Sequence, residues 1–287
     1  MSFRGDFLAV DWGTTNRRVF VIEQGRVVRT RRDGKGVTAV ADFPAEGAAM
    51  RAAFGDLPML MAGMVGSNLG WASAPYVAAP TGISDLAAAL HRIDARTAIV
   101  PGVSVTGPAD VMRGEEVQLL GAVEAGLVPR DALLVQPGTH CKWAEVEHGR
   151  IARFTTAMTG ELFALLRGHG LLAAQLSAEV TRGEAFLAGV AEGGKRDIAA
   201  SLFGIRAAKL LGERDDDDAA SYASGLLIGS DTAARLEQSR HDTAYILADP
   251  ALGGLYAAAI EAHGRAARII DSHAAFTAGI IAIGTQA

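Results

Sequence analysis

Apolar residues near the start of the chain occur in short runs that are separated by polar turns. Runs at 7–10, 19–23 and 27–29 predict three strands in a meander, because each run is short and is bounded by polar residues or Gly. Helical and strand-like patterns then alternate. Helices are expected at 45–54, 86–93 and 114–125, and strands at 59–61 and 97–100.

The second half of the chain repeats this order. Strands are expected at 132–136, 143–146, 151–154, 244–247 and 267–270, and helices at 160–166, 183–191, 198–211, 219–237, 255–263 and 276–283. A meander followed by helices and strands, present twice, predicts two α/β domains with mixed sheets. We place their junction where a helix ends in Gly126 and Pro129, which gives domains 1–126 and 127–287.

Composition narrows the class of protein. A length of 287 residues suits two domains, and 49% apolar with 21% charged residues argues against extended disorder. A net charge of −5 without a long basic run argues against nucleic-acid binding, and no apolar stretch is long enough for a membrane span. Residues 1–6 do not resemble a signal peptide, and the single cysteine, Cys141, favours a reducing cytoplasm. A homodimer is left open.

Two Gly-Thr turns, one in each half, each lie between strand-like runs. Gly leaves the backbone N–H open to a ligand, and the Thr hydroxyl can donate to an anion. The pair predicts two facing loops that clamp a polyphosphate, made by Gly13, Thr14, Thr15 and Asn16 and by Gly138, Thr139, His140 and Lys142. Asp11, which precedes the first turn, is placed to hold a divalent cation such as Mg²⁺.

These segments resemble the 2-dehydro-3-deoxygalactonokinase family, within the superfamily of sugar kinases, heat-shock chaperones and actin. The matching segments are 11–18, 61–71, 74–76, 111–116, 137–143, 158–162 and 224–229. The resemblance implies two ribonuclease-H-like (actin-like ATPase) domains with mixed sheets around a central cleft. It also implies ATP-dependent phosphorylation of the 6-hydroxyl of 2-dehydro-3-deoxy-D-galactonate, with the sugar acid bound by the N-terminal domain and the nucleotide by the C-terminal domain.

The resemblance also suggests a catalytic base. In related carbohydrate kinases, a Gly-acid pair at a helix start ahead of the second phosphate loop supplies the catalytic carboxylate, and Glu115 occupies that place. This chain has Glu where the relatives carry Asp, and acids in a first helical turn also simply favour the helix dipole. Adjacent helical residues point about 100° apart, so Glu115 is expected to be the base and Glu116 to be its alternative or a substrate contact.

The sugar acid needs a cation for its carboxylate, and Arg binds carboxylates bidentately. The family pattern gives this role to Arg18 and Arg113, with Arg17 as a third candidate; an exposed strand position is the ordinary alternative for Arg18. A Gly-rich loop is expected to approach the sugar, or else to be a plain connection. Its residues are Gly63, Met64, Ser67 and Asn68, and Trp71 either walls the pocket or fills the core.

The remaining candidates concern the nucleotide. Lys142 either neutralises phosphate charge or faces solvent. Thr159 and Gly160 either face a ligand or cap a helix, and the adenosine is expected near Ala248, Asp249 and Gly253. Two other functions stay open: a kinase of another small acid such as pantothenate, and a nucleotide-dependent sugar-acid sensor without turnover.

Overall fold

The structure is a computed structural model that describes residues 3–287 of the chain. The chain divides into two compact units. The first consists of Met1–Asp131, Val146–Phe154 and Ser272–Ala287, and the second of Ala132–Glu145 and Thr155–Asp271. The division expected at 126/127 made each domain one continuous stretch, whereas the first compact unit gathers three separate stretches of the chain.

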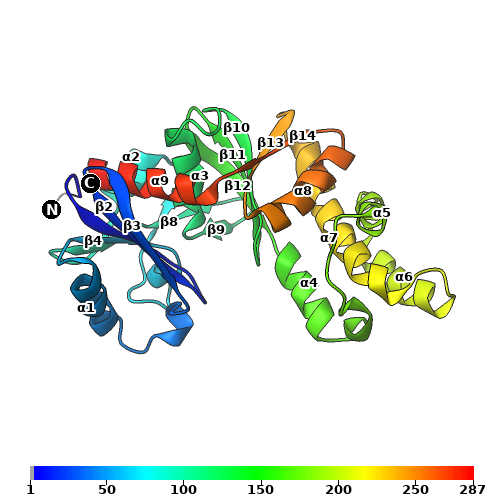
Figure 1. Ribbon diagram of the computed structural model, residues 1–287. Coiled ribbons are helices and arrows are strands. Elements are labelled where there is room, and N and C mark those ends of the chain that lie inside the picture. Colours follow the sequence, from blue (N-terminus) through cyan, green and yellow to red (C-terminus); the bar gives the residue numbers. More distant parts are fainter. Residues whose placement is uncertain (1–2) are drawn as a thin grey trace. The chain divides into compact units, whose positions relative to one another are not determined.

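A six-stranded sheet forms the centre of the first unit, drawn in blue to cyan in Figure 1. Its strand order is β3-β2-β1-β4-β7-β6, with β1 (Phe7–Trp12), β2 (Arg17–Glu23), β3 (Arg26–Asp33), β4 (Met59–Ala62), β6 (His91–Asp94) and β7 (Thr97–Ile99). Strand β2 is antiparallel to β1 and β3, whereas β4 is parallel to β1 and β7. The central strands β1 and β4 are apolar throughout except for Asp11, which places a carboxyl group at the end of a buried strand.

A second, five-stranded sheet has the order β12-β11-β10-β13-β14, with β10 (Ala132–Gln136), β11 (Cys141–Glu147), β12 (Arg150–Ala157), β13 (Thr243–Leu247) and β14 (Ala266–Ile270). Strand β13 is parallel to β10 and β14. This order matches β3-β2-β1-β4-β7 of the first sheet element by element. The predicted duplication, with a meander and mixed pairing in each half, is therefore confirmed.

All helices except α2 lie close to their expected positions. They are α1 (Phe43–Phe54), α2 (Ile83–Ala88), α3 (Glu115–Glu124), α4 (Thr159–Gly168), α5 (Glu184–Gly193), α6 (Ile198–Leu210), α7 (Asp216–Gln238), α8 (Pro250–Ala262) and α9 (Ser272–Gln286). Single 3₁₀ turns occupy Val37–Ala39, Met64–Gly66 and Ala173–Leu176. Within residues 3–287, no helix combines the length and the apolar character that a membrane span needs.

The prediction of one helix at 86–93 was wrong. Helix α2 ends at Ala88, and His91–Asp94 forms the edge strand β6, paired antiparallel with β7. A small separate sheet of β5 (Tyr76–Ala78), β8 (Gly102–Val105) and β9 (Asp110–Met112) was not predicted at all. These strands have three or four residues each, which is too short for a hydrophobic period to show.

Two helix pairs pack so closely that only glycine fits at the crossing. In the first unit, a Cβ added to Gly121 of α3 would lie 1.9 Å from the carbonyl oxygen of Ala275 in α9. In the second unit, a Cβ on Gly225 of α7 would lie 2.0 Å from the carbonyl oxygen of Phe186 in α5. The two members of each pair lie side by side in Figure 1. Backbone contact of this kind fixes how α3 and α7 lie against their partner helices, and both helices supply residues to the candidate site.

Candidate active site

The carboxyl group of Asp11 lies near the Arg18 guanidinium and the Glu115 carboxylate, both in the first unit. Arg18 on β2 is its cross-strand neighbour in the register, and Arg32 on β3 is in turn the neighbour of Arg18. Burial raises the pKa of Asp11 to about 6; the Arg18 guanidinium opposes this rise, and the Glu115 carboxylate adds to it. Asp11, Arg18 and Glu115 therefore share one electrostatic environment, although Glu115 lies far from both strand residues in the sequence.

The start of α3 is shaped by a backbone turn. Gly114 has φ = +107°, and a Cβ there would lie 2.9 Å from the Cα of Gly63, so the two segments touch through glycine. The Arg113 backbone N–H donates to Glu115 Oε2 over 2.9 Å, and the Gly114 N–H donates to both carboxyl oxygens of Glu116 over 2.8 and 2.7 Å. Both glutamates therefore cap the first turn of the helix.

The two glutamates differ in their access to solvent. Glu115 is half-buried, whereas Glu116 has no exposed surface. Burial, followed by the nearby Glu115 charge, raises the pKa of Glu116 to about 8. In this conformation Glu116 cannot touch a solute, so the substrate contact expected for it would need a rearrangement of the helix start.

The Gly-rich loop after β4 approaches the first phosphate turn through its backbone. Gly63 has φ = +95°, and a Cβ there would lie 2.9 Å from the Trp12 carbonyl oxygen. The Ser67 hydroxyl donates to the Met64 carbonyl oxygen over 2.7 Å, which closes the 3₁₀ turn, and the Asn68 side chain is exposed. The loop is thus a tight, hydrogen-bonded turn against β1 rather than a loose connection.

Trp71 packs against apolar residues of the first unit, which was the alternative to a wall of the sugar pocket. Its ring stacks on Phe43 with centroids 6.5 Å apart, and a Cβ on Gly47 of α1 would lie 2.7 Å from it. The side chain packs against the apolar cluster of the first sheet and is partly buried.

The three candidate arginines have different surroundings. Arg17 is buried, bridges Asp33 and Glu46 over 2.8 and 2.9 Å, and lies over the Trp12 ring. Arg113 lies 4.3 Å from the Tyr76 ring centroid and donates through Nη2 to a carbonyl oxygen; its other two nitrogens are buried with no hydrogen-bond partner within residues 3–287. Arg18 is half-buried beside Asp11 and contacts Nδ1 of His273.

The turn at residues 13–16, the first of the two turns predicted to bind phosphate, is held by backbone hydrogen bonds. The Gly13 N–H donates to the Asn16 carbonyl oxygen over 2.9 Å, and the Val37 N–H donates to the Gly13 carbonyl oxygen over 3.0 Å. Thr14, Thr15 and Asn16 are all exposed at the tip. Their side chains are therefore available to a ligand while the turn that carries them is fixed.

The second phosphate turn is held by the start of α4. The Glu161 N–H donates to the Thr139 carbonyl oxygen over 2.8 Å, and a Cβ on Gly160 would lie 2.2 Å from the Gly138 carbonyl oxygen. The His140 ring lies 2.6 Å from the Glu161 carboxylate. Gly138, Thr139 and His140 are exposed, so this turn too presents its backbone and hydroxyl outward.

Lys142 does not face solvent as its alternative reading proposed. It is 5% exposed, and its ammonium group donates to the Thr156 hydroxyl over 2.8 Å. The ammonium group is thus held inside the protein, two residues after His140 of the turn that is predicted to bind phosphate.

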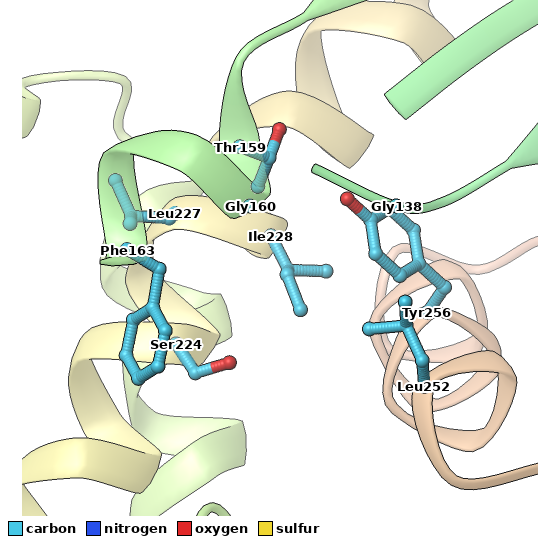
Figure 2. A pocket seen from close by; sticks show the side chains of 9 residues that line it. All are labelled: Gly138, Thr159, Gly160, Phe163, Ser224, Leu227, Ile228, Leu252 and Tyr256. Atoms are coloured by element: carbon cyan, nitrogen blue, oxygen red, sulfur yellow. The ribbon is translucent and has the colours of Figure 1, made fainter. Parts of the chain in front are cut away.

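An apolar pocket opens beside this turn in the second unit (Figure 2). Helix α7 supplies Leu227 and Ile228, helix α8 supplies Leu252 and Tyr256, and Phe163 comes from α4; Gly138, Thr159, Gly160 and Ser224 complete the lining. The cavity is small, about 70 Å³, and its apolar walls lie beside the backbone of Gly138, one of the residues predicted to bind phosphate. The sequence pattern did not find these helical residues, because apolar residues at helical spacing indicate core packing first.

The residues expected to bind the adenosine lie at the N-terminal end of α8. Asp249 caps this helix, accepting from the backbone N–H groups of Ala251 and Leu252 over 3.0 and 3.2 Å. Gly253 is buried against Ile269, and Ala248 packs on the core of the second sheet. None of these three residues lines the pocket of Figure 2, whereas Asp249 lines a second, larger pocket of about 620 Å³ together with Pro250, Leu252 and Ile269.

No group of three or more His, Cys, Asp or Glu side chains suited to a metal occurs among residues 3–287. Mg²⁺ is usually held by one or two carboxylates together with substrate phosphates and water. The partly buried Asp11 carboxyl fits this mode, because a nearby cation would offset the burial that raises its pKa.

The duplicated sheets define a protein of the sugar kinase and actin-like ATPase fold. The activator of 2-hydroxyisocaproyl-CoA dehydratase from Clostridium difficile, solved with bound ADPNP, superposes with a TM-score of 0.52 at 10% identity over 98% of this chain and 95% of that chain. This likeness shows the fold alone.

The chain belongs to the 2-keto-3-deoxy-galactonokinase family, whose model matches residues 11–283. The 2-dehydro-3-deoxygalactonokinase of Escherichia coli (strain K12) is 36% identical over 96% of this chain and 97% of its own length. The crystal structure of a "putative 2-dehydro-3-deoxygalactonokinase protein" from Sinorhizobium meliloti superposes with a TM-score of 0.90 at 32% identity, over 96% of this chain and 97% of that chain.

Proposed function

We propose that this protein is an ATP-dependent kinase that transfers the γ-phosphoryl group to the 6-hydroxyl of 2-dehydro-3-deoxy-D-galactonate. The products are 2-dehydro-3-deoxy-6-phosphogalactonate and ADP, a step of galactonate catabolism. The observation that carries the proposal is the 36% identity with the named Escherichia coli kinase along nearly the whole of both chains. The arrangement of Asp11, Arg18 and Glu115 in the first unit is consistent with it.

Glu115 is the proposed general base. Its carboxyl group is half-buried at the start of α3, so it can reach a solute, and its hydrogen bond from the Arg113 N–H fixes its orientation. A base at this place would take the proton of the acceptor hydroxyl as the phosphorus–oxygen bond forms. Glu116 supports the same helix start from inside and is proposed to position Glu115 rather than to contact the substrate.

Asp11 is the proposed carboxylate for Mg²⁺. When bound, the cation would neutralise charge on the transferring phosphoryl group. The exposed Thr14, Thr15 and Asn16 would donate to phosphate oxygens from a turn that is already fixed. Asp11 has an acidic neighbour in Glu115, so the cation would also lower the mutual repulsion of the two carboxylates.

Arg18 is the proposed partner of the substrate carboxylate. It lies beside Asp11, whereas Arg17 is engaged by two carboxylates and Arg113 is enclosed against Tyr76 and Ala74. Arg113 then shapes the acceptor loop through Gly66, whose added Cβ would lie 3.0 Å from Nη1. The exposed Asn68 and the backbone of Gly63 are proposed sugar contacts from the same loop.

The apolar pocket of the second unit is the proposed nucleoside site. The Gly138–Thr139 turn and the start of α4 would bind the phosphates at its end, with the Lys142 ammonium beneath. Asp249 and Gly253 would shape the entrance by fixing the start of α8.

The test is an ADP-release assay over a panel of 2-keto-3-deoxy sugar acids and pantothenate, with the product identified by phosphorus NMR. We expect the highest kcat/KM for 2-dehydro-3-deoxy-D-galactonate, a 6-phosphate product, and loss of activity in excess chelator. A higher kcat/KM for pantothenate would identify a kinase of another acid. Binding of ATP and sugar acid without any turnover would identify a sensor and overturn the proposal.

A further inference from the structure

Helix α7 presents one face to the nucleoside pocket, and that face continues beyond the pocket to an acidic residue. Ser224, Leu227 and Ile228 line the pocket, and Asp231 follows at helical spacing on the same face. Neither the family resemblance nor the sequence pattern assigned a role to Asp231.

The Asp231 carboxylate receives hydrogen bonds from two different elements. Its Oδ2 atom accepts from the indole N–H of Trp143 on β11 and from the hydroxyl of Thr159, the first residue of α4, each over 3.0 Å. The buried Cys141 thiol, also on β11, is a further neighbour of this carboxylate, and the two groups influence each other's pKa. One side chain of α7 thus joins the strand that leaves the second phosphate turn to the helix that packs against it.

Tyr256 extends the connection to α8. Its ring forms a wall of the pocket (Figure 2), and the Cys141 and Thr159 side chains both influence the pKa of its hydroxyl, which burial raises. Burial is the largest influence on Asp231 and raises the pKa of its carboxyl, while the bonds from Trp143 and Thr159 oppose the rise.

Thr159 connects the Asp231 hydrogen bond to the turn at Gly138 and Thr139, because the two residues after it contact that turn. The residue after it, Gly160, is pressed on the Gly138 carbonyl oxygen, where an added Cβ would lie 2.2 Å away. The next backbone N–H, that of Glu161, donates to the Thr139 carbonyl oxygen. A displacement of Thr159 would therefore move Gly160 and Glu161, and with them the contacts that hold Gly138 and Thr139.

We propose that Asp231 is a positioning residue for nucleotide binding, which holds the start of α4 and the Gly138–Thr139 turn in the geometry that accepts nucleotide phosphates. This inference rests on the proposed function in taking the ligand to be a nucleoside di- or triphosphate. It predicts that Asp231 controls affinity for the nucleotide and leaves affinity for the sugar acid unchanged, since every group that it holds belongs to the second unit.

The experiment compares Asp231→Ala, Asp231→Asn and Thr159→Val with the wild type. Titration calorimetry gives the Kd for ADP, and steady-state kinetics give the KM for ATP and for the sugar acid. Asp231→Ala should raise the ADP Kd and the ATP KM at least tenfold and leave the sugar-acid KM within about twofold. Asp231→Asn keeps an oxygen that can accept from Trp143 and Thr159, so it should restore most of the ADP affinity.

Ser201→Ala is the matched control. The Ser201 hydroxyl donates to Glu192 over 2.9 Å in the same unit, is half-buried and does not line the pocket, so its loss should leave the ADP Kd unchanged. Thr159→Val removes the donated hydrogen bond in a side chain of similar shape. Thr159→Val should also raise the ADP Kd, and it replaces Asp231→Ala in the comparison if the alanine variant fails to fold.

Three outcomes would overturn the inference: an ADP Kd within twofold of wild type in folded Asp231→Ala or Thr159→Val, equal rises in the KM values for ATP and sugar acid, or no recovery in Asp231→Asn. Failure of the proposed function is distinguishable from these outcomes. A wild-type protein that binds ADP but phosphorylates no sugar acid would refute the kinase, whereas the ADP Kd values would still decide the role of Asp231.

Discussion

Glu115 and Glu116 are neighbours in sequence with opposite surroundings. The Glu115 carboxyl is partly exposed and accepts one backbone hydrogen bond, whereas the Glu116 carboxyl is enclosed and accepts the Gly114 N–H with both oxygens. The difference follows from the helix, which turns the two side chains about 100° apart, one toward the solvent and one into the core. A pair of like charges in one turn is thereby separated into two roles.

Glu115→Gln should lower kcat about a hundred- to ten-thousandfold, because it keeps the size of the side chain and removes the proton acceptor. The Kd values for ATP and sugar acid should stay within a few fold. Steady-state kinetics with Glu116→Gln alongside provide the check, and Glu116→Gln should lower kcat much less. A wild-type kcat for Glu115→Gln would move the base elsewhere, with Asp11 as the first alternative.

Glu116 should make stability depend on pH. Its pKa is raised from 4.5 to about 8 in the folded protein, so the folded state holds a proton that the unfolded state releases between these values. Its contribution to stability is therefore complete below about pH 4.5 and is lost as the pH rises through 8. The loss is on the order of a few kcal/mol.

Urea unfolding of wild type and Glu116→Gln from pH 5 to 9 measures this effect. The wild type should lose stability with rising pH, and the variant, which carries no titrating group at 116, should lose distinctly less. Parallel curves for the two proteins would show that Glu116 is not protonated in the folded state near neutral pH.

At the scale of elements, glycine decides how α5 and α7 pack. Gly189 and Gly193 of α5 face the backbone of α7, and Gly225 and Gly229 of α7 face the backbone of α5, with added Cβ atoms 2.0–2.5 Å from a carbonyl oxygen in every case. Glycine in a helix interior costs about 1 kcal/mol relative to Ala, so four of them at one crossing indicate a packing requirement. This crossing fixes α7, which lines the pocket and carries Asp231.

Gly225→Ala should lower the free energy of unfolding by about 1–3 kcal/mol or more, because its Cβ would overlap the Phe186 carbonyl oxygen. Gly204→Ala is the matched control in α6, since its added Cβ would meet nothing within 4 Å and should stabilise by up to about 1 kcal/mol. Denaturant unfolding of the two variants measures the sign of the change in the free energy of unfolding for each. Stabilisation by Gly225→Ala would mean that α5 and α7 lie further apart than described here.

At the scale of the whole molecule, the last helix returns to the first unit. Phe276 of α9 is 1% exposed and stacks on Phe20 of β2 with centroids 5.5 Å apart, and Gly279 packs on Val117 of α3. The end of the chain therefore completes the core that supports β1, which carries Asp11, and α3, which carries Glu115.

Phe276→Ala should destabilise the first unit by about 3–5 kcal/mol through the cavity that it leaves. Hydrogen exchange measured by mass spectrometry should show faster exchange in β1, β2 and α3, with α5 and α7 unchanged. Phe203→Ala is the control, because that side chain is 63% exposed on α6. Faster exchange confined to α5 and α7 would contradict the assignment of α9 to the first unit.

The sequence by itself determined the duplicated meander, the two Gly-Thr turns and the family. These features are local: strand periodicity, turn residues and ordered motifs depend on neighbours along the chain. The sequence did not predict the short strands β5, β6, β8 and β9. Each has only three or four residues and takes its shape from the strands with which it pairs.

Tertiary structure alone decided which of these residues are enclosed and what they touch. It buried Glu116 while leaving Glu115 partly exposed, turned Lys142 inward, packed Trp71 against the core with part of its surface exposed, and brought Asp231 to Thr159 from a helix far along the chain. It also joined α9 to the first unit. The physical reason is that burial of a charge and contact between distant side chains depend on how the elements pack, and a linear pattern of apolar and polar residues does not contain that packing.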